Sequence, residues 1–131
     1  MRDLFFAQGV AAAEAGCYEE ALRCFDEYLF SEGFALRPED AEAWNNRAYV
    51  LCFLDQYDEA VKSCDTAIML RPAYADPYDI KARALLRLGR YEEALPAFEK
   101  YIELAPPWET DRILNAKQAV ERLKVKLSFG W

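Results

Sequence analysis

The sequence repeats itself with a fixed period of 34 residues. Residues 41–74 align on residues 75–108 without a gap, and aromatic, small and proline positions coincide; Tyr57, for example, falls on Tyr91. A period of this size is typical of stacked repeats, in which each copy is one supersecondary unit that buries its apolar face against the next. Such folds usually present an extended binding surface.

A third copy lies upstream of these two. The pattern around Tyr18 matches the pattern around Tyr57, and counting back from Tyr18 places the start of this copy near Arg2. The two tyrosines are 39 residues apart instead of 34, so five residues are inserted, and the sequence places them around residues 30–36. We expect the insertion to lengthen the second helix of this copy or its turn.

Each copy has the local signals of two helices joined by a short turn. Apolar residues recur at helical spacing, and small residues such as Ala48 and Ala60 allow two helices to approach closely. Gly89 suits the end of a first helix, where a left-handed backbone is needed. Pro72 and Pro106 end the second helices, because the residue before a proline is pushed out of helical geometry.

These motifs resemble the tetratricopeptide repeat family, whose pattern has an early aromatic residue, a small residue, Gly-x-Tyr, Ala, a second aromatic residue, Ala and a closing Pro. The first copy matches less well, with Phe5, Gly9 and Phe25 at the key positions. The resemblance implies an all-α fold, a right-handed α–α superhelix (solenoid) in a single domain over residues 1–131. Its expected parts are repeat one at about 2–38, repeat two at 41–74, repeat three at 75–108 and a seventh, capping helix at about 110–127.

Three residues depart from the family pattern. Cys64 stands where an aromatic residue is usual, and Tyr28 and Tyr101 stand where alanine is usual. We expect Cys64 to lie in the core. The two tyrosines should splay the helix pairs slightly or reach toward the next repeat.

The expected capping helix combines an apolar stripe with a basic opposite face. Arg112, Lys117 and Lys124 are among the residues of that basic face. A solenoid end needs a covering element with a polar outer side, and we interpret this helix as that cover. The alternative is a basic helix that binds a partner or a membrane surface.

Composition narrows the classes of function. The net charge is −7, with +4 from residue 112 onward and therefore −11 before it. An acidic body disfavours nucleic acid, whose binding depends on neutralising phosphates, and favours a basic or neutral partner. No segment is long and apolar enough to span a membrane.

The residues that usually carry chemistry are few. There is no histidine, and the four cysteines form no Cys-x-x-Cys motif, so the usual metal-ligand clusters and histidine-based catalysis have no candidates. We expect no enzyme activity, no metal and no cofactor. Free cysteines fit a reducing cytoplasm, with Cys17 the most exposed thiol.

The resemblance also implies a binding surface, because first helices of successive repeats in this family line a concave groove. It places an apolar and aromatic floor beside amides and carboxylates. The implied groove residues are Phe6, Val10, Glu42, Asn45, Asn46, Tyr49, Phe53, Asp76, Asp79 and Arg83. The aromatic rings have the alternative of packing in the core, and the carboxylates that of only solubilising the surface.

Some relatives grip the C-terminal carboxylate of a chaperone tail with Lys, Asn and Arg in this groove. Carried over to this sequence, those positions hold Phe6, Val10, Asn46, Asp76 and Ile80. Only Asn46 matches, and Asp76 would repel a carboxylate. We therefore predict that the chain has no carboxylate clamp.

The sequence thus predicts a non-catalytic interaction module or scaffold whose groove holds an apolar partner segment with Lys or Arg residues. One alternative is chaperone-like shielding of an apolar client. Another is self-assembly into a homo-oligomer through Trp108, Phe129 and Trp131. The insertion is interpreted as structural variation, with a binding loop that presents Phe30 and Phe34 as its alternative.

Overall fold

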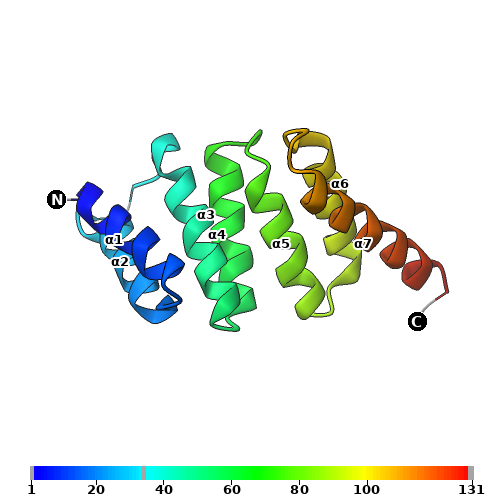
Figure 1. Cartoon of the computed structure of the whole chain (residues 1–131), viewed down its shortest axis with the longest axis horizontal. Helices are drawn as coiled ribbons and strands as arrows, with labels where there is room; N and C mark the ends of the chain where they lie inside the picture. Colours follow the sequence, from blue (N-terminus) through cyan, green and yellow to red (C-terminus); the bar gives the residue numbers. More distant parts are fainter. Residues whose placement is uncertain (1, 34, 130–131) are drawn as a thin grey trace.

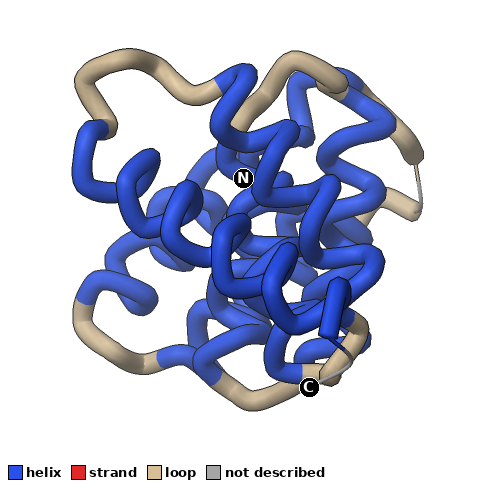
Figure 2. Tube along the Cα trace, turned by 90° about the vertical axis from the view of Figure 1, so that its right-hand side faces the viewer, coloured by secondary structure: helices blue, strands red, loops and turns tan. Residues whose placement is uncertain are grey.

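The computed structural model describes residues 2–33 and 35–129, which form helices and turns only (Figure 2). The helices stand side by side in a row from the N-terminal to the C-terminal end (Figure 1). The predicted all-α helical repeat fold is confirmed. The elements are α1 (Arg2–Glu14), α2 (Tyr18–Phe30), the short 3-10 helix η1 (Pro38–Asp40), α3 (Ala41–Phe53), α4 (Tyr57–Leu70), α5 (Asp76–Arg87), α6 (Tyr91–Leu104) and α7 (Thr110–Phe129).

In the turn after the first helix of each pair, one residue has a positive φ. Gly16 and Gly89 have φ of 79° and 74°, and Asp55, at the same position in the second pair, has φ of 59°. Glycine adopts this left-handed backbone without steric cost, whereas aspartate tolerates it less well. The Asp55 carboxylate accepts a hydrogen bond from the Tyr57 hydroxyl at 2.8 Å, which helps to hold this turn.

The paired helices pack closely because small residues lie where they cross. Ala48, Ala60, Ala82 and Ala94 are completely buried, as expected from the sequence. In the first pair Gly9 has this role: a Cβ atom added there would lie 2.7 Å from the Phe25 ring.

The residues that depart from the family pattern tie successive units together. The Tyr28 hydroxyl donates a hydrogen bond to Asp40 in η1 at 3.0 Å. The Tyr101 hydroxyl donates one to Glu109, just before α7, at 2.9 Å. The expectation that these tyrosines reach toward the next unit is confirmed, and Cys64 is buried in the core as predicted.

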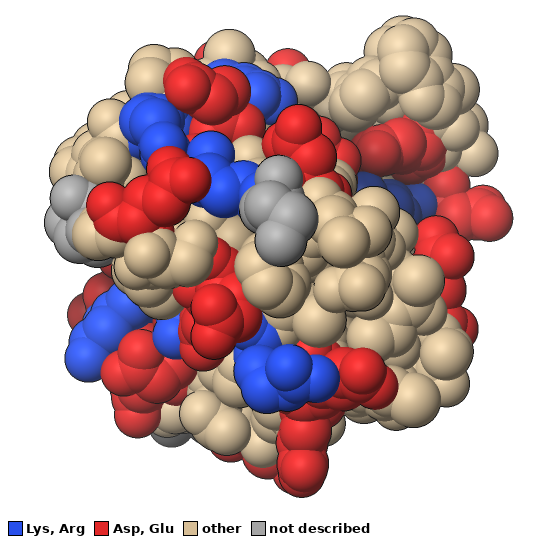
Figure 3. Space-filling model, turned by 90° about the vertical axis from the view of Figure 1, so that its left-hand side faces the viewer, with Lys and Arg blue, Asp and Glu red and all other residues tan. Residues whose placement is uncertain are grey.

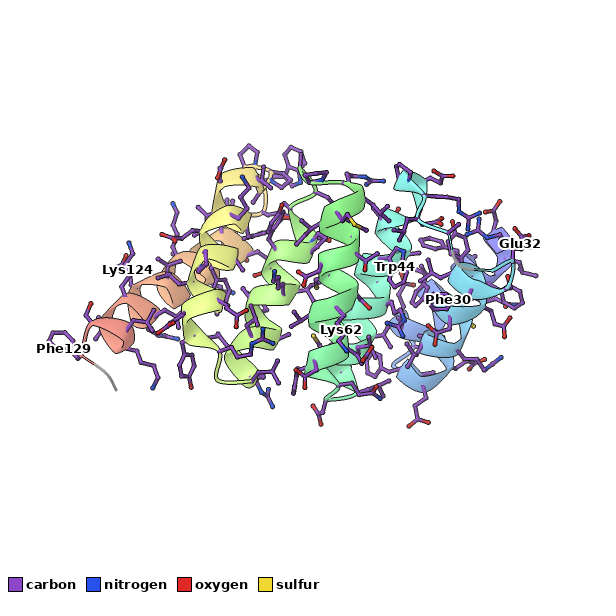
Figure 4. All side chains as sticks on the ribbon, turned by 180° about the vertical axis from the view of Figure 1, so that it is seen from behind. Phe30, Glu32, Trp44, Lys62, Lys124 and Phe129 are labelled. Carbon is purple, nitrogen blue, oxygen red and sulfur yellow. The ribbon has the colours of Figure 1, made fainter. Side chains whose placement is uncertain are left out.

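The insertion lengthens the turn after α2 and leaves the helix at its usual length. The second helices α2, α4 and α6 have 13, 14 and 14 residues, and Gly33 with φ of 88° lies in the loop that follows α2. The Phe30 ring packs edge-on against Trp44 of α3, with 5.6 Å between ring centroids (Figure 4). Phe30 therefore contributes to packing between repeats, and Phe34 lies outside the described residues.

The last helix covers the third repeat. Ala116, Val120 and Leu123 of α7 are buried and join the apolar cluster of α5 and α6. The helix continues to Phe129, two residues beyond the predicted end at Leu127. Among the described helices, none has the length and apolar character needed to cross a membrane.

Candidate interaction groove

Two adjoining hollows lie on the side of the molecule formed by α1, α3, α5 and α7, which faces the viewer in Figure 1 and lies behind in Figure 4. We call them together the groove. The main hollow, of about 510 Å³, is lined by Asn45, Asn46, Tyr49, Cys52, Phe53, Asp76, Asp79, Ile80, Arg83 and Arg112. The minor hollow, of about 200 Å³, is lined by Val10, Ala13, Glu14, Phe25, Asn46, Tyr49 and Val50. Asn46 and Tyr49 line both hollows and lie between them.

The floor of the groove carries two exposed aromatic rings on α3. Tyr49 is 43% exposed and Phe53 is 51% exposed, and their ring centroids are 4.9 Å apart. Phe53 also stacks on Tyr18, with 4.3 Å between centroids and 9° between planes. The two rings form a supported apolar ledge that an apolar group of a partner could cover.

Two of the expected groove residues lie elsewhere. Phe6 packs between α1 and α2, with its ring centroid 6.0 Å from that of Phe25 and 5.4 Å from that of Tyr28. It lines neither hollow and is partly buried against the core of the first repeat, the arrangement that the core-packing alternative describes. Glu42 is exposed in the first turn of α3 and also lines neither hollow.

The carboxylates of the third repeat are paired within the chain. Arg112 donates to Asp76 at 2.7 Å and to Asp79 at 3.0 Å, and Arg83 donates to Asp79 at 3.1 Å. The Asp79 side chain is only 4% exposed. Both carboxylates line the main hollow, as expected, but α7 brings a guanidinium against them, so they are not free acidic groups.

The sequence did not identify Arg112 as a groove residue. It was assigned to the solvent-facing side of the capping helix, but it also donates to Glu109 at 3.2 Å and stacks over the Tyr101 ring at 5.1 Å. Burial alone would lower the pKa of this guanidinium, but the hydrogen bonds and charges of Asp76 and Asp79 outweigh burial and raise it. Arg112 therefore stays charged, and it lines one wall of the main hollow.

The adjacent amides Asn45 and Asn46 differ in their surroundings. Asn45 is 3% exposed; its Nδ2 donates to Asp76 over a long 3.5 Å, and its Oδ1 has no hydrogen-bond partner among the described residues. Asn46 is half-buried between the two hollows. In the minor hollow, Glu14 makes no ion pair with any part of the chain that the structure describes.

The thiols offer little chemistry. Cys52 lines the main hollow, and burial raises its pKa to about 11, so it stays protonated at neutral pH and is a poor nucleophile or metal ligand. Cys17 is exposed, as expected. Within residues 2–33 and 35–129, no group of three or more Cys, Asp or Glu side chains is arranged to hold a metal ion.

The sequence pattern of the tetratricopeptide repeat matches residues 39–106. A comparison with curated proteins gives no match.

Solved structures of similar fold are numerous, and three are informative. A type III secretion (T3SS) complex from Aeromonas hydrophila has a TM-score of 0.86 at 21% identity, over 97% of this chain and 83% of that chain. The first tetratricopeptide repeat domain of Spaghetti (RPAP3), bound to the HSP90 peptide SRMEEVD, has a TM-score of 0.83 at 22% identity, over 97% and 93%. PcrH in complex with the chaperone binding region of PopD has a TM-score of 0.83 at 19% identity, over 95% and 91%.

Proposed function

The chain belongs to the tetratricopeptide repeat family, and on this basis we propose that it is a non-catalytic protein-interaction module that holds an extended partner segment in the groove. Two proteins of similar fold support this class of function, because RPAP3 is bound to an HSP90 peptide and PcrH to a region of PopD. Their low identity to this chain leaves the partner to be argued from the groove itself.

The observation that carries the proposal is the apolar ledge of Tyr49 and Phe53. Large apolar side chains that stay exposed in a concave surface mark contact sites, and a few buried aromatic anchors supply most of the affinity of an interface. The main hollow beside the ledge measures about 510 Å³, within the usual range for a binding pocket. We propose that an apolar side chain of the partner seats there.

The minor hollow supplies a charge preference. Glu14 lies there without a cationic partner among the described residues, and the whole chain carries a net charge of −7. A Lys or Arg of the partner would therefore be favoured at the α1 end of the groove, and complementary charge would speed its capture.

An acidic chaperone tail fits this groove poorly. Asp76 occupies a position at which the clamp relatives have lysine, and Arg112 is already engaged by Asp76 and Asp79. We expect the peptide SRMEEVD, which RPAP3 binds, to bind this chain more weakly than about 10 µM. Tighter binding in a titration calorimetry experiment would contradict this view of the groove.

The test of the proposal changes the ledge. Peptides selected from a phage-displayed library of random linear sequences should bind wild type and lose at least tenfold in affinity, about 1.4 kcal/mol, with Tyr49→Ala/Phe53→Ala. Because both rings are half exposed, helicity by circular dichroism should be retained.

Met69→Ala is the matched control. Met69 is similarly exposed but lies on α4, outside the groove, so its removal should leave binding unchanged. Equal binding by wild type and the double variant would move the site away from the groove.

A further inference from the structure

Asn45 presents a buried hydrogen-bond acceptor with which none of the described residues pairs. Asn45 is only 3% exposed. Its Oδ1 has no hydrogen-bond partner among the described residues. Buried polar atoms are nearly always paired, and an unpaired one costs free energy. An unpaired acceptor in a residue that lines a hollow indicates a donor that arrives with a ligand; because Oδ1 itself has less than 1 Å² of accessible surface, the amide must turn toward the hollow to meet that donor.

The orientation of the amide is set by its neighbour. Nδ2 is the atom that faces Asp76, at 3.5 Å, and a carboxylate accepts hydrogen bonds and cannot donate them when ionised. Oδ1 is therefore the atom left over, in a residue that lines the main hollow.

The charges around Asn45 disfavour a cation as the missing donor. Arg112 already binds the same Asp76 that Asn45 contacts, and Arg83 and Arg112 share Asp79. Arg112 also holds Glu109, so each of the three carboxylates at this end of the groove already has a guanidinium partner. An incoming Lys or Arg would meet two like charges whose carboxylate partners are taken, so a neutral donor fits best.

We infer that Asn45 Oδ1 accepts a hydrogen bond from a main-chain N–H of the partner, in an extended apolar segment that crosses the groove at α3 and α5. The inference rests on the proposed function. Main-chain N–H groups are neutral, and in an extended chain every second one points to the same side. The adjoining side chain would lie against Phe53 and Ile80, which line the same hollow.

This geometry predicts a position in the partner that excludes proline. Proline has no N–H, and an N-methylated residue likewise lacks the donor while it keeps its side chain. The selected peptides should therefore contain one position at which neither proline nor N-methylation is tolerated, next to the residue that covers the ledge.

The experiment is an N-methyl scan of the tightest library peptide against wild type and Asn45→Leu, with affinities from titration calorimetry. Leucine has a similar size and removes the acceptor. At one peptide position N-methylation should weaken binding to wild type at least tenfold but binding to Asn45→Leu less than threefold, the coupling expected for groups in contact. Asn46→Leu is the control. It removes the neighbouring amide and keeps Asn45, so N-methylation of the same peptide position should still weaken binding at least tenfold. The unfolding midpoint of each variant shows that it is folded.

The outcomes separate this inference from the proposed function. An N-methyl penalty of equal size in wild type and Asn45→Leu, or no penalty at any position, overturns the inference while the groove stands. Peptides that bind Tyr49→Ala/Phe53→Ala as tightly as wild type overturn the groove and the inference together, as does a library that yields no binder. Should Asn45→Leu fail to fold, Asn45→Ala and Asn45→Val, which also lack the acceptor, replace it.

Discussion

Gly9 shows how one residue sets the spacing of a helix pair. Glycine is unfavourable inside a helix by about 1 kcal/mol relative to alanine, yet it occupies the middle of α1 and is buried there. The Phe25 ring fills the space that a side chain would need, with its nearest atom 2.7 Å from an added Cβ. Packing against Phe25 therefore outweighs helix propensity at this position.

We predict that Gly9→Ala lowers the free energy of unfolding by about 1–3 kcal/mol, because overpacking in a core costs this much and exceeds the gain in helix propensity. Urea unfolding, monitored by circular dichroism, measures this change in the free energy of unfolding. In a Phe25→Leu background the smaller side chain leaves room, so the same substitution should be close to neutral. An equal loss in both backgrounds would show that contact with Phe25 is not the cause.

The aromatic residues show where sequence reasoning stops at the residue scale. The repeat register places Phe6, Tyr49 and Phe53 on first helices, which is enough to nominate all three for the groove. It cannot say which ring turns inward, because that depends on space left by other helices. Phe25 and Tyr28 of α2 offer ring faces beside α1, and Phe6 packs against both of them, partly buried.

Among the elements, α7 has two functions. Its apolar stripe covers the third repeat, and its first turn places Arg112 against α5 in the groove. The stripe is visible in the sequence because it recurs at helical spacing. The position of Arg112 is not visible in the sequence. It depends on how α7 packs on α6 beside α5, and no repeat register extends beyond residue 108 to predict that packing.

We predict that Arg112→Met destabilises the fold by about 1–3 kcal/mol, since it leaves the buried Asp79 with Arg83 alone and removes a charge-assisted hydrogen bond from Asp76. Lys124→Met on the same helix is the control; Lys124 is labelled in Figure 4, and its ion pair with Glu121 is exposed and 4.0 Å long. The substitution should therefore change stability by less than about 0.5 kcal/mol. Thermal unfolding of both variants makes the comparison. Similar losses would mean that Arg112 acts only as surface charge.

Across the whole molecule, the two ends of the solenoid differ in charge. Residues 1–40 contain nine acidic and three basic residues, and α7 contains five basic and two acidic ones. Figure 3 shows carboxylates, with Lys and Arg side chains among them, around an uncharged area on the N-terminal end. At the other end Trp108 is 80% exposed in the turn before α7, and Phe129 is also exposed, while Trp131 lies outside the described residues.

From these ends we predict weak head-to-tail association of the 131-residue chain. The average mass in sedimentation equilibrium should rise with concentration, and high salt should reduce the rise because it screens surface charge. Deletion of residues 128–131 together with Trp108→Ser should lower the mass to that of the monomer, whereas Met69→Ser should not. A monomer mass for wild type at every concentration would exclude the self-assembly alternative.

The contacts of Arg112 also decide where the working unit of this protein ends. A fragment cut after the third repeat would retain the ledge but would take Arg112 away from Asp76 and Asp79, and would leave Arg83 as the one guanidinium beside these two carboxylates. Such a fragment would favour a cationic group at the α5 end of the groove, where the intact chain disfavours one. In this chain α7 covers the last repeat and also sets the charge of the groove beside it. Binding specificity measured on a fragment without α7 would therefore not be that of the whole chain.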